Sequence, residues 1–290
     1  MIGDAPNAVP IRGGTDIMVE LNFDRHRPEI VIDLGRVTEI GTWQRVADTP
    51  ALAGTRREGD AAIRIGAGVT WTTIQHELAD VLPGLAIAAR TVGSPQIRNR
   101  GTLAGNLGTA SPAGDGLPPL VAAGAVVEVE SAARGTRYVP VEDWIERPKK
   151  SVRAGDELIT ACIVPVAQGP QQFSKIGTRN AMVISVASFA IDIDLVRCTV
   201  GTGIGSAGPT VNRAHDAESF LVDELTRGDQ WRSPAPLSRD LRMAFGEHVA
   251  AAARPIDDVR GTAAYRRHAV SIMAARTLDW AWKEHIASCS

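Results

Sequence analysis

Residues 91–115, with the sequence TVGSPQIRNRGTLAGNLGTASPAGD, constrain most strongly what this chain can fold into. The 25 residues include five glycines, two prolines and five serines or threonines, but only three charged side chains. Glycine and proline disfavour regular helices, and the small polar residues give a strand little apolar surface to bury. We therefore expect a long ordered loop here, and such loops in compact domains usually have a function.

Backbone N–H groups, small hydroxyls and the Asn106 amide dominate the chemistry of this stretch, which ends in one carboxylate, Asp115. Gly101 and Gly105 allow the backbone to approach a ligand closely, and consecutive N–H groups in a glycine-rich turn bind anions without a cationic side chain. Such donors followed by an acidic acceptor suit the pyrophosphate and ribose of a nucleotide. Because glycine-rich loops alone are a weak signal, an irregular loop packed by its own side chains is an equal alternative.

A second glycine turn lies much earlier in the chain. The segment IRGGTDI, residues 11–17, stands between an apolar strand-like start and a helix-like segment at residues 18–21. Two glycine turns far apart in sequence could hold one diphosphate from two sides.

Both stretches closely resemble the FAD-binding subunits of molybdenum hydroxylases. This family includes the medium subunit of carbon monoxide dehydrogenase and the flavin domain of xanthine dehydrogenase. IRGGTDI and QIRNRGTLAGN with a trailing SPAGD make a long, specific match, and SKIG (174–177) and GIGSAGPT (203–210) resemble the family's C-terminal domain. The resemblance covers nearly the whole chain. Members usually carry a further strand and helix before the first glycine loop, so we expect either a short start here or a start codon placed late.

The resemblance implies an α+β fold in two domains. Residues 1–168 would form a FAD-binding domain of the PCMH (vanillyl-alcohol-oxidase-like) type, with a small lobe at about 1–50 and a larger lobe at about 51–168. Residues 171–290 would form a C-terminal carbon monoxide dehydrogenase flavoprotein-like domain, with a three-stranded sheet and helices. The residues themselves agree, because the turn residues at 168–170 suit a linker and strands followed by helices suggest a separate α+β domain.

The resemblance also implies which residues bind FAD. The two pyrophosphate loops would be formed by Ile11, Arg12, Gly13, Gly14, Thr15, Asp16 and Ile17, and by Thr102, Gly105, Asn106, Thr109 and Ser111. Asp115 matches an acidic residue held against FAD, and Ile159 matches an apolar residue near the flavin ring. Val92 stands where members often have an aromatic residue, so stacking would be absent. Neither loop contains His or Cys, so the FAD is expected to be non-covalent.

Lys175 matches a lysine near the pyrimidine edge of the isoalloxazine ring. A cation there would favour an anionic reduced flavin. The alternative is an exposed lysine with only a structural role.

The implied function is electron relay within a larger enzyme. Molybdenum cofactor would lie in a large partner subunit and [2Fe-2S] clusters in a small one, in a dimer of heterotrimers, and electrons would pass through FAD to an external acceptor. The cysteines at 162, 198 and 289 are too few and too scattered to hold a cluster, and the six histidines lack metal-site spacing. We therefore expect neither catalytic residues nor metal ligands in this chain. A stand-alone FAD oxidase or dehydrogenase and a flavin-free scaffold subunit are the alternatives.

The overall composition gives few further constraints. A net charge of −2 and a pI near 6.3 provide no global attraction to nucleic acid or anionic membranes. No apolar run is long enough to span a bilayer, and residues 1–10 lack the features of a signal peptide. We expect a cytoplasmic protein.

Periodicity predicts several individual elements. We expect a buried strand at residues 30–34, a half-buried strand at residues 61–69, and a helix that Thr70 caps and Pro83 ends. Helices are expected at residues 214–225, 237–253 and 263–286. Six arginines of this tail (Arg239, Arg242, Arg254, Arg260, Arg266 and Arg267) should form a solvated helical face or, alternatively, dock an acidic partner subunit.

Overall fold

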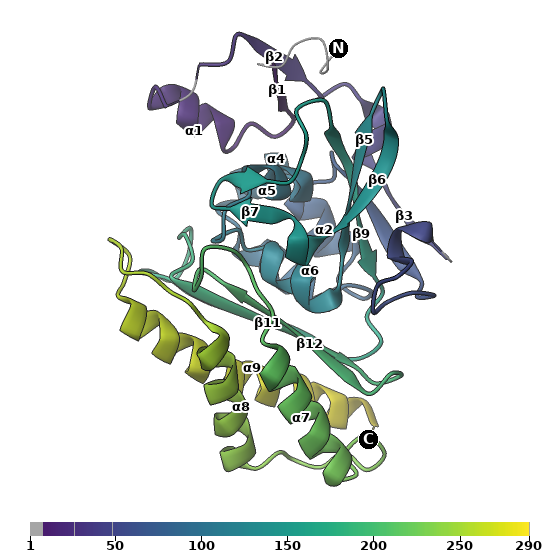
Figure 1. Cartoon of the computed structure of the whole chain (residues 1–290), viewed down its shortest axis with the longest axis vertical. Coiled ribbons are helices and arrows are strands. Elements are labelled where there is room, and N and C mark those ends of the chain that lie inside the picture. Colours follow the sequence, from purple (N-terminus) through teal and green to yellow (C-terminus); the bar gives the residue numbers. More distant parts are fainter. Residues whose placement is uncertain (1–7, 26, 48, 290) are drawn as a thin grey trace.

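The computed structural model describes residues 8–25, 27–47 and 49–289. Three tiers follow one another from top to bottom in Figure 1. They are a small lobe (residues 8–37), a large lobe built on a five-stranded sheet (residues 38–167), and a C-terminal unit in which helices cover a three-stranded sheet (residues 171–289).

The small lobe consists of two strands and a helix. β1 (Ala8–Ile11) pairs in parallel with β2 (Ile30–Asp33), and α1 (Ile17–Asn22) follows the first glycine turn. The strand expected at residues 30–34 is present, but its predicted burial is wrong. Ile30 and Val31, which point to opposite faces of the strand, are 47% and 46% exposed, because among the described residues β2 pairs only with β1 in a small two-stranded sheet.

The large lobe contains an antiparallel sheet with the strand order β3-β4-β9-β5-β6. Its strands are Trp43–Val46 (β3), Ala62–Gly66 (β4), Val126–Ser131 (β5), Gly135–Pro140 (β6) and Leu158–Pro165 (β9). The half-buried character predicted for β4 is wrong, because both its faces are covered. A Cβ atom on Gly66 would lie 2.3 Å from the carbonyl oxygen of Ile40, which packs directly over that strand end. The short hairpin of β7 (Ile145–Arg147) and β8 (Lys150–Ser151) lies outside this sheet.

Residues 91–115 are not one long loop as predicted. They contain α4 (Pro95–Arg100) and α5 (Leu103–Thr109). The Ser94 and Thr102 hydroxyls cap these helices by accepting hydrogen bonds from backbone N–H groups in the first turn, and Pro95 occupies a favourable first helical position. In these short helices, the favourable capping residues and Pro95 therefore compensate for the low helix propensity of the glycines.

Three further helices complete the large lobe, together with short 3-10 turns at Thr38–Gly41, Pro50–Leu52 and Val141–Asp143. They are α2 (Trp71–Glu77), α3 (Pro83–Thr91) and the fully buried α6 (Leu117–Ala123). Thr70 caps α2 as expected, but Pro83 does not end that helix. Pro83 instead begins α3, because proline suits the first turn of a helix.

The C-terminal unit has the expected order of three strands and then three helices. β10 (Gln171–Ile176), β11 (Ala187–Asp194) and β12 (Thr199–Gly205) form an antiparallel sheet, followed by α7 (His215–Arg227), α8 (Arg239–Ala252) and α9 (Ala263–Cys289). Phe189 and Ile191 of β11 pack in one apolar cluster with residues of these helices. One arginine of the expected solvated face is misassigned. Arg266 is only 4% exposed, and it bonds the Ser206 carbonyl and Asp258.

The other face of the C-terminal sheet packs against the large lobe. A Cβ atom on Gly201 or Gly203 of β12 would lie 2.1 Å from a carbonyl oxygen of α6, that of Ala122 or Pro118 respectively. Only glycine permits α6 to lie this close to the strand.

A buried charge cluster also crosses this boundary. Arg57 is 1% exposed, and its Nε atom lies 2.6 Å from an oxygen of Asp60. Its Nη1 atom lies 3.2 Å from Asp192 and from Asp194, which are both buried on β11. Arg197 adds a second cation at the edge of the cluster.

Candidate functional site

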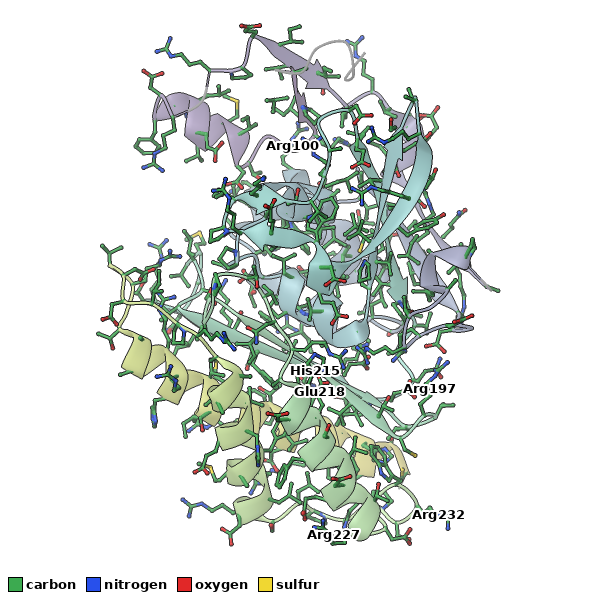
Figure 2. The ribbon with its side chains drawn as sticks, in the orientation of Figure 1. Arg100, Arg197, His215, Glu218, Arg227 and Arg232 are labelled. Carbon is green, nitrogen blue, oxygen red and sulfur yellow. The ribbon has the colours of Figure 1, made fainter. Side chains whose placement is uncertain are left out.

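The two glycine turns singled out in the sequence meet in space. A Cβ atom on Gly13 would lie 2.1 Å from the carbonyl oxygen of Arg100, at the end of α4. A Cβ atom on Gly101 would lie 3.3 Å from Oγ1 of Thr15. Figure 2 shows Arg100 where the small lobe approaches the large lobe. The first turn therefore packs backbone to backbone against the junction of α4 and α5.

The first turn presents backbone donors that are not used within the protein. Within the described part of the chain, the N–H groups of Gly13, Gly14, Thr15 and Asp16 donate no hydrogen bond. The Asp16 carboxylate accepts a hydrogen bond from the Thr109 hydroxyl, which ties this turn to the end of α5. A run of free N–H groups on a backbone held in this way is suited to an anion.

Polar residues of the second stretch mainly shape the loop that follows α5. Asn106 Oδ1 accepts a hydrogen bond from the Gly116 N–H at 3.2 Å, and a Cβ atom on Gly114 would lie 2.7 Å from the Asn106 amide. The Ser111 hydroxyl accepts from the Ala113 N–H at 3.3 Å. These bonds hold the turn that carries Asp115.

Asp115 and Lys175 meet although they come from different tiers. Lys175 Nζ lies 2.6 Å from Asp115 Oδ2, and both side chains are about nine-tenths buried. Burial raises the pKa of Asp115, while the charge and hydrogen bond of Lys175 lower it. The alternative of an exposed lysine is therefore wrong.

The remaining predicted residues border this region. Ile11 is the last residue of β1, and Ile17 is the first residue of α1. The Gly105 N–H donates the hydrogen bond that the Thr102 hydroxyl accepts as the cap of α5. Ile159 on β9 is buried, with its Cδ1 atom 3.8 Å from where a Cβ atom on Gly108 of α5 would lie.

Val92 and Arg12 lie at the edges of the same region. Val92 caps the end of α3 and is partly buried against the main core of the large lobe. Arg12 Nε is buried, and it has no hydrogen-bond partner within the described residues.

Sequence reasoning missed two residues of this region. The Thr91 carbonyl accepts from Lys175 Nζ at 3.2 Å, and the Arg98 guanidinium donates to the carbonyls of Val92 and Gly93 at 3.1 Å. Arg98 belongs to the QIRN segment, which could have drawn attention to it. Thr91 acts through its backbone, so its side-chain type gave little signal.

The residues present fit a dinucleotide cofactor. Free N–H groups suit a pyrophosphate, and Asp115 Oδ1 is a buried acceptor that lacks a hydrogen-bond partner within the described residues. No group of three or more His, Cys, Asp or Glu side chains that could hold a metal occurs in residues 8–25, 27–47 and 49–289. The fold and site together define a dinucleotide-binding protein with a two-lobed binding region and an appended α+β unit.

Family models match both parts of the chain. Residues 1–167 match the FAD binding domain in molybdopterin dehydrogenase, and residues 172–281 match the CO dehydrogenase flavoprotein C-terminal domain. The chain belongs to the family of FAD-binding subunits of molybdenum hydroxylases.

Relatives of known function align with this chain over most of their length. The nicotinate dehydrogenase FAD-subunit of Eubacterium barkeri is 31% identical over 248 residues, which are 82% of this chain and 79% of the relative. The nicotine 6-hydroxylase medium subunit of Paenarthrobacter nicotinovorans is 31% identical over 278 residues, covering 92% and 87%.

Solved structures share the fold. A chain of carbon monoxide dehydrogenase from Hydrogenophaga pseudoflava matches with a TM-score of 0.83 at 23% identity, covering 98% of this chain and 93% of that one. A chain of quinoline 2-oxidoreductase from Pseudomonas putida 86 matches with the same TM-score at 20% identity, covering 97% and 92%. The predicted α+β fold is confirmed. No helix in the part of the chain that the structure describes is both long and apolar enough to cross a membrane.

Proposed function

We propose that this chain holds FAD non-covalently and relays electrons within a heteromeric molybdenum hydroxylase. Electrons would enter from [2Fe-2S] clusters of a small partner subunit, after substrate oxidation in a large molybdenum subunit, and leave to an external acceptor. The observation that carries the proposal is the meeting of the two glycine turns. Four N–H groups of the first turn donate no hydrogen bond within the described residues, and the buried Asp115–Lys175 pair lies in the same region.

The proposed binding residues are those expected from the sequence. The first loop is residues 11–17, and the N–H groups of its glycines would bind the pyrophosphate without a cationic side chain. Thr102, Thr109 and Ser111 would contribute from the second loop and also hold its shape through the bonds described above. Val92 and Ile159 would border the flavin as apolar contacts.

Bound FAD would supply the redox chemistry, and the protein would supply orientation and electrostatics. The packing of Gly13 on Arg100 fixes the spacing of the two loops, so both can hold one ligand. Asp115 Oδ1 would accept a hydrogen bond from the ligand, because it is buried and otherwise lacks a donor among the described residues. The buried Arg12 Nε, which donates no hydrogen bond within the described residues, could likewise donate to the ligand.

Organisation and location form the rest of the proposal. We place the domain boundary between residues 168 and 171, the assembly as a dimer of heterotrimers, and the complex in the cytoplasm. Native mass spectrometry, limited proteolysis and cell fractionation would test these three points.

A matched pair of glycine variants tests FAD binding. Gly13→Ala would drive a Cβ atom into the Arg100 carbonyl, whereas Gly155→Ala meets no atom within 4 Å. We expect the natively purified wild type and Gly155→Ala to carry flavin, and Gly13→Ala to bind FAD at least tenfold more weakly while remaining folded. Equal FAD affinity in the two variants, or no flavin in the wild type even after FAD is added, would contradict the proposal.

A further inference from the structure

The Asp115–Lys175 pair carries a consequence that the sequence did not suggest. Lys175 leaves β10 of the C-terminal unit, and Asp115 comes from the turn before α6 in the large lobe. Their Nζ and Oδ2 atoms are 2.6 Å apart, and only 8% and 10% of the two side chains are exposed. The lysine charge is therefore opposed at contact distance in a place that water hardly reaches.

The end of α3 adds to this opposition. The Thr91 carbonyl belongs to the last turn of α3 and accepts from Lys175 Nζ at 3.2 Å. Carbonyls at a helix C-terminus lack helical partners and carry the negative end of the helix dipole. The Thr91 hydroxyl donates to the Ala88 carbonyl at 2.8 Å, which keeps this residue in the helical turn.

The two carboxylate oxygens of Asp115 have different surroundings. Oδ2 accepts from Lys175 and lies 3.5 Å from the Thr91 hydroxyl. Oδ1 is buried, but it has no hydrogen-bond partner within the described residues. A buried acceptor without a donor is costly, so Oδ1 is the atom available to a ligand.

The pair is held from both tiers. The Ser206 N–H, just after β12, donates to the Pro112 carbonyl at 2.9 Å and so fixes the turn that leads to Asp115. On the same sheet, Lys175 is paired with Ser188. If Lys175 Nζ moved away from Asp115, it would also lose its hydrogen bond to the Thr91 carbonyl, and both bonds cross this boundary.

We propose that Asp115 is the residue that sets the charge next to the flavin: bound FAD meets a neutral Asp115–Lys175 pair with one free acceptor oxygen, and not an uncompensated lysine cation. This inference rests on the proposed FAD binding and deepens it. It reverses the expectation from the sequence, in which Lys175 alone would favour the reduced flavin. Asp115 acts here as a positioning residue toward Lys175 and as an acceptor toward the ligand.

The reduction potential of bound FAD tests the proposal, measured on the complex as purified by redox titration of the flavin absorbance. Asp115→Asn leaves the Lys175 charge unopposed, so it should favour the reduced flavin at least tenfold, a rise of about 30 mV for a two-electron couple. Lys175→Met should shift the equilibrium tenfold or more the other way when the titration is run above the pKa of Asp115, which rises once the lysine is removed. The double variant should return to within about threefold of the wild type, because a neutral pair replaces a neutral pair. Asp223→Asn, an exposed carboxylate on α7, is the matched control and should leave the potential unchanged.

An uncompensated lysine cation predicts a different set of reduction potentials. If Lys175 acts as an uncompensated cation, Asp115→Asn will leave the potential unchanged, and the double variant will match Lys175→Met. If Asp115→Asn alone fails to fold or to retain FAD, the comparison of the double variant with Lys175→Met still tests the proposal. The proposal requires the equilibrium constants for flavin reduction in these two variants to differ at least tenfold. A wild-type chain without FAD would instead overturn the proposed function, which separates the two failures.

Discussion

Replacing Arg57 with methionine tests the buried charge cluster between the large lobe and the C-terminal unit. Methionine keeps much of the volume of the side chain but removes the cation that three buried carboxylates share. It also removes the donor to the Val166 carbonyl, at 3.2 Å from Nη2. Removing one partner of a buried ion pair costs about 3–5 kcal/mol, because it leaves a charge buried without compensation.

The remaining contacts place the expected loss within that range. Asp60 and Asp194 still have Arg197, at 2.5 and 3.4 Å. Among the described residues, Asp192 keeps only the Gln171 amide, at 3.3 Å, as a direct partner. Because one carboxylate and not three is left without a direct cation, we expect a loss near the lower bound, about 3 kcal/mol of the free energy of unfolding.

The pH dependence of this loss has a definite sign. Burial already raises the pKa of Asp192 in the folded protein, and Arg57 is the main cation that opposes the shift. Without Arg57 the pKa of Asp192 rises further, so the folded variant binds a proton more readily than the unfolded chain. The deficit of the variant should therefore shrink as the pH falls from neutral toward the unfolded pKa.

Guanidinium denaturation followed by tryptophan fluorescence, at pH 7 and pH 5, measures the effect. Arg232→Met is the control, since Arg232 is exposed and lies at the opposite end of the molecule from the glycine turns (Figure 2). Arg57→Met/Asp192→Asn should recover more than half of the loss. The reasoning fails if Arg57→Met unfolds within about 1 kcal/mol of the wild type at pH 7, which would mean that the cluster is already compensated without its central cation.

Three further variants test other features. Hydrogen bonds from Arg137, and to a smaller extent from the Ala154 N–H and Arg134, lower the pKa of Glu157 from 4.5 to about 2. Glu157→Gln should therefore lose about 2 kcal/mol of the free energy of unfolding at pH 7, and less as the pH falls from 4.5 toward 2. Urea denaturation at pH 7 and pH 3 measures this difference, and an equal loss at both pH values would contradict it. Gly203→Ala places a Cβ atom 2.1 Å from the Pro118 carbonyl and should lower the free energy of unfolding by about 1–3 kcal/mol in urea denaturation. An unchanged denaturation midpoint would contradict this expectation. Thr102→Ala removes the cap of α5 and should cost about 1 kcal/mol and weaken FAD binding in calorimetry; unchanged stability would argue against the cap.

Local signals and motifs predicted much of the fold. Thr70 capped a helix as expected, and the three C-terminal helices lie close to their predicted bounds. The missed helices α4 and α5 had readable caps at Ser94 and Thr102, but the many glycines were given more weight. The error was therefore one of weighing two local signals.

Long-range features of the candidate site were beyond such reasoning. The ion pair of Asp115 with Lys175 joins residues far apart in the chain, and no periodicity predicts which lysine meets which carboxylate. The exposure of β2 depends on whether another layer lies over its sheet, which the strand's own apolar sequence cannot report. The meeting of the two glycine turns was expected because two anion-binding motifs can share one diphosphate and because both motifs match pyrophosphate loops of the family.

The close packing of α6 on the glycines of β12 determines whether the two parts of the chain can fold separately. The C-terminal sheet has its own helices on one face, but Phe173 and Ala190 on the other pack with Ala88 and Ala122 of the large lobe. A fragment starting at residue 171 would expose that apolar face, together with the strand backbone that α6 now covers. Two separate family models meet near residue 170, but expression of either half alone should give an insoluble or partly folded product.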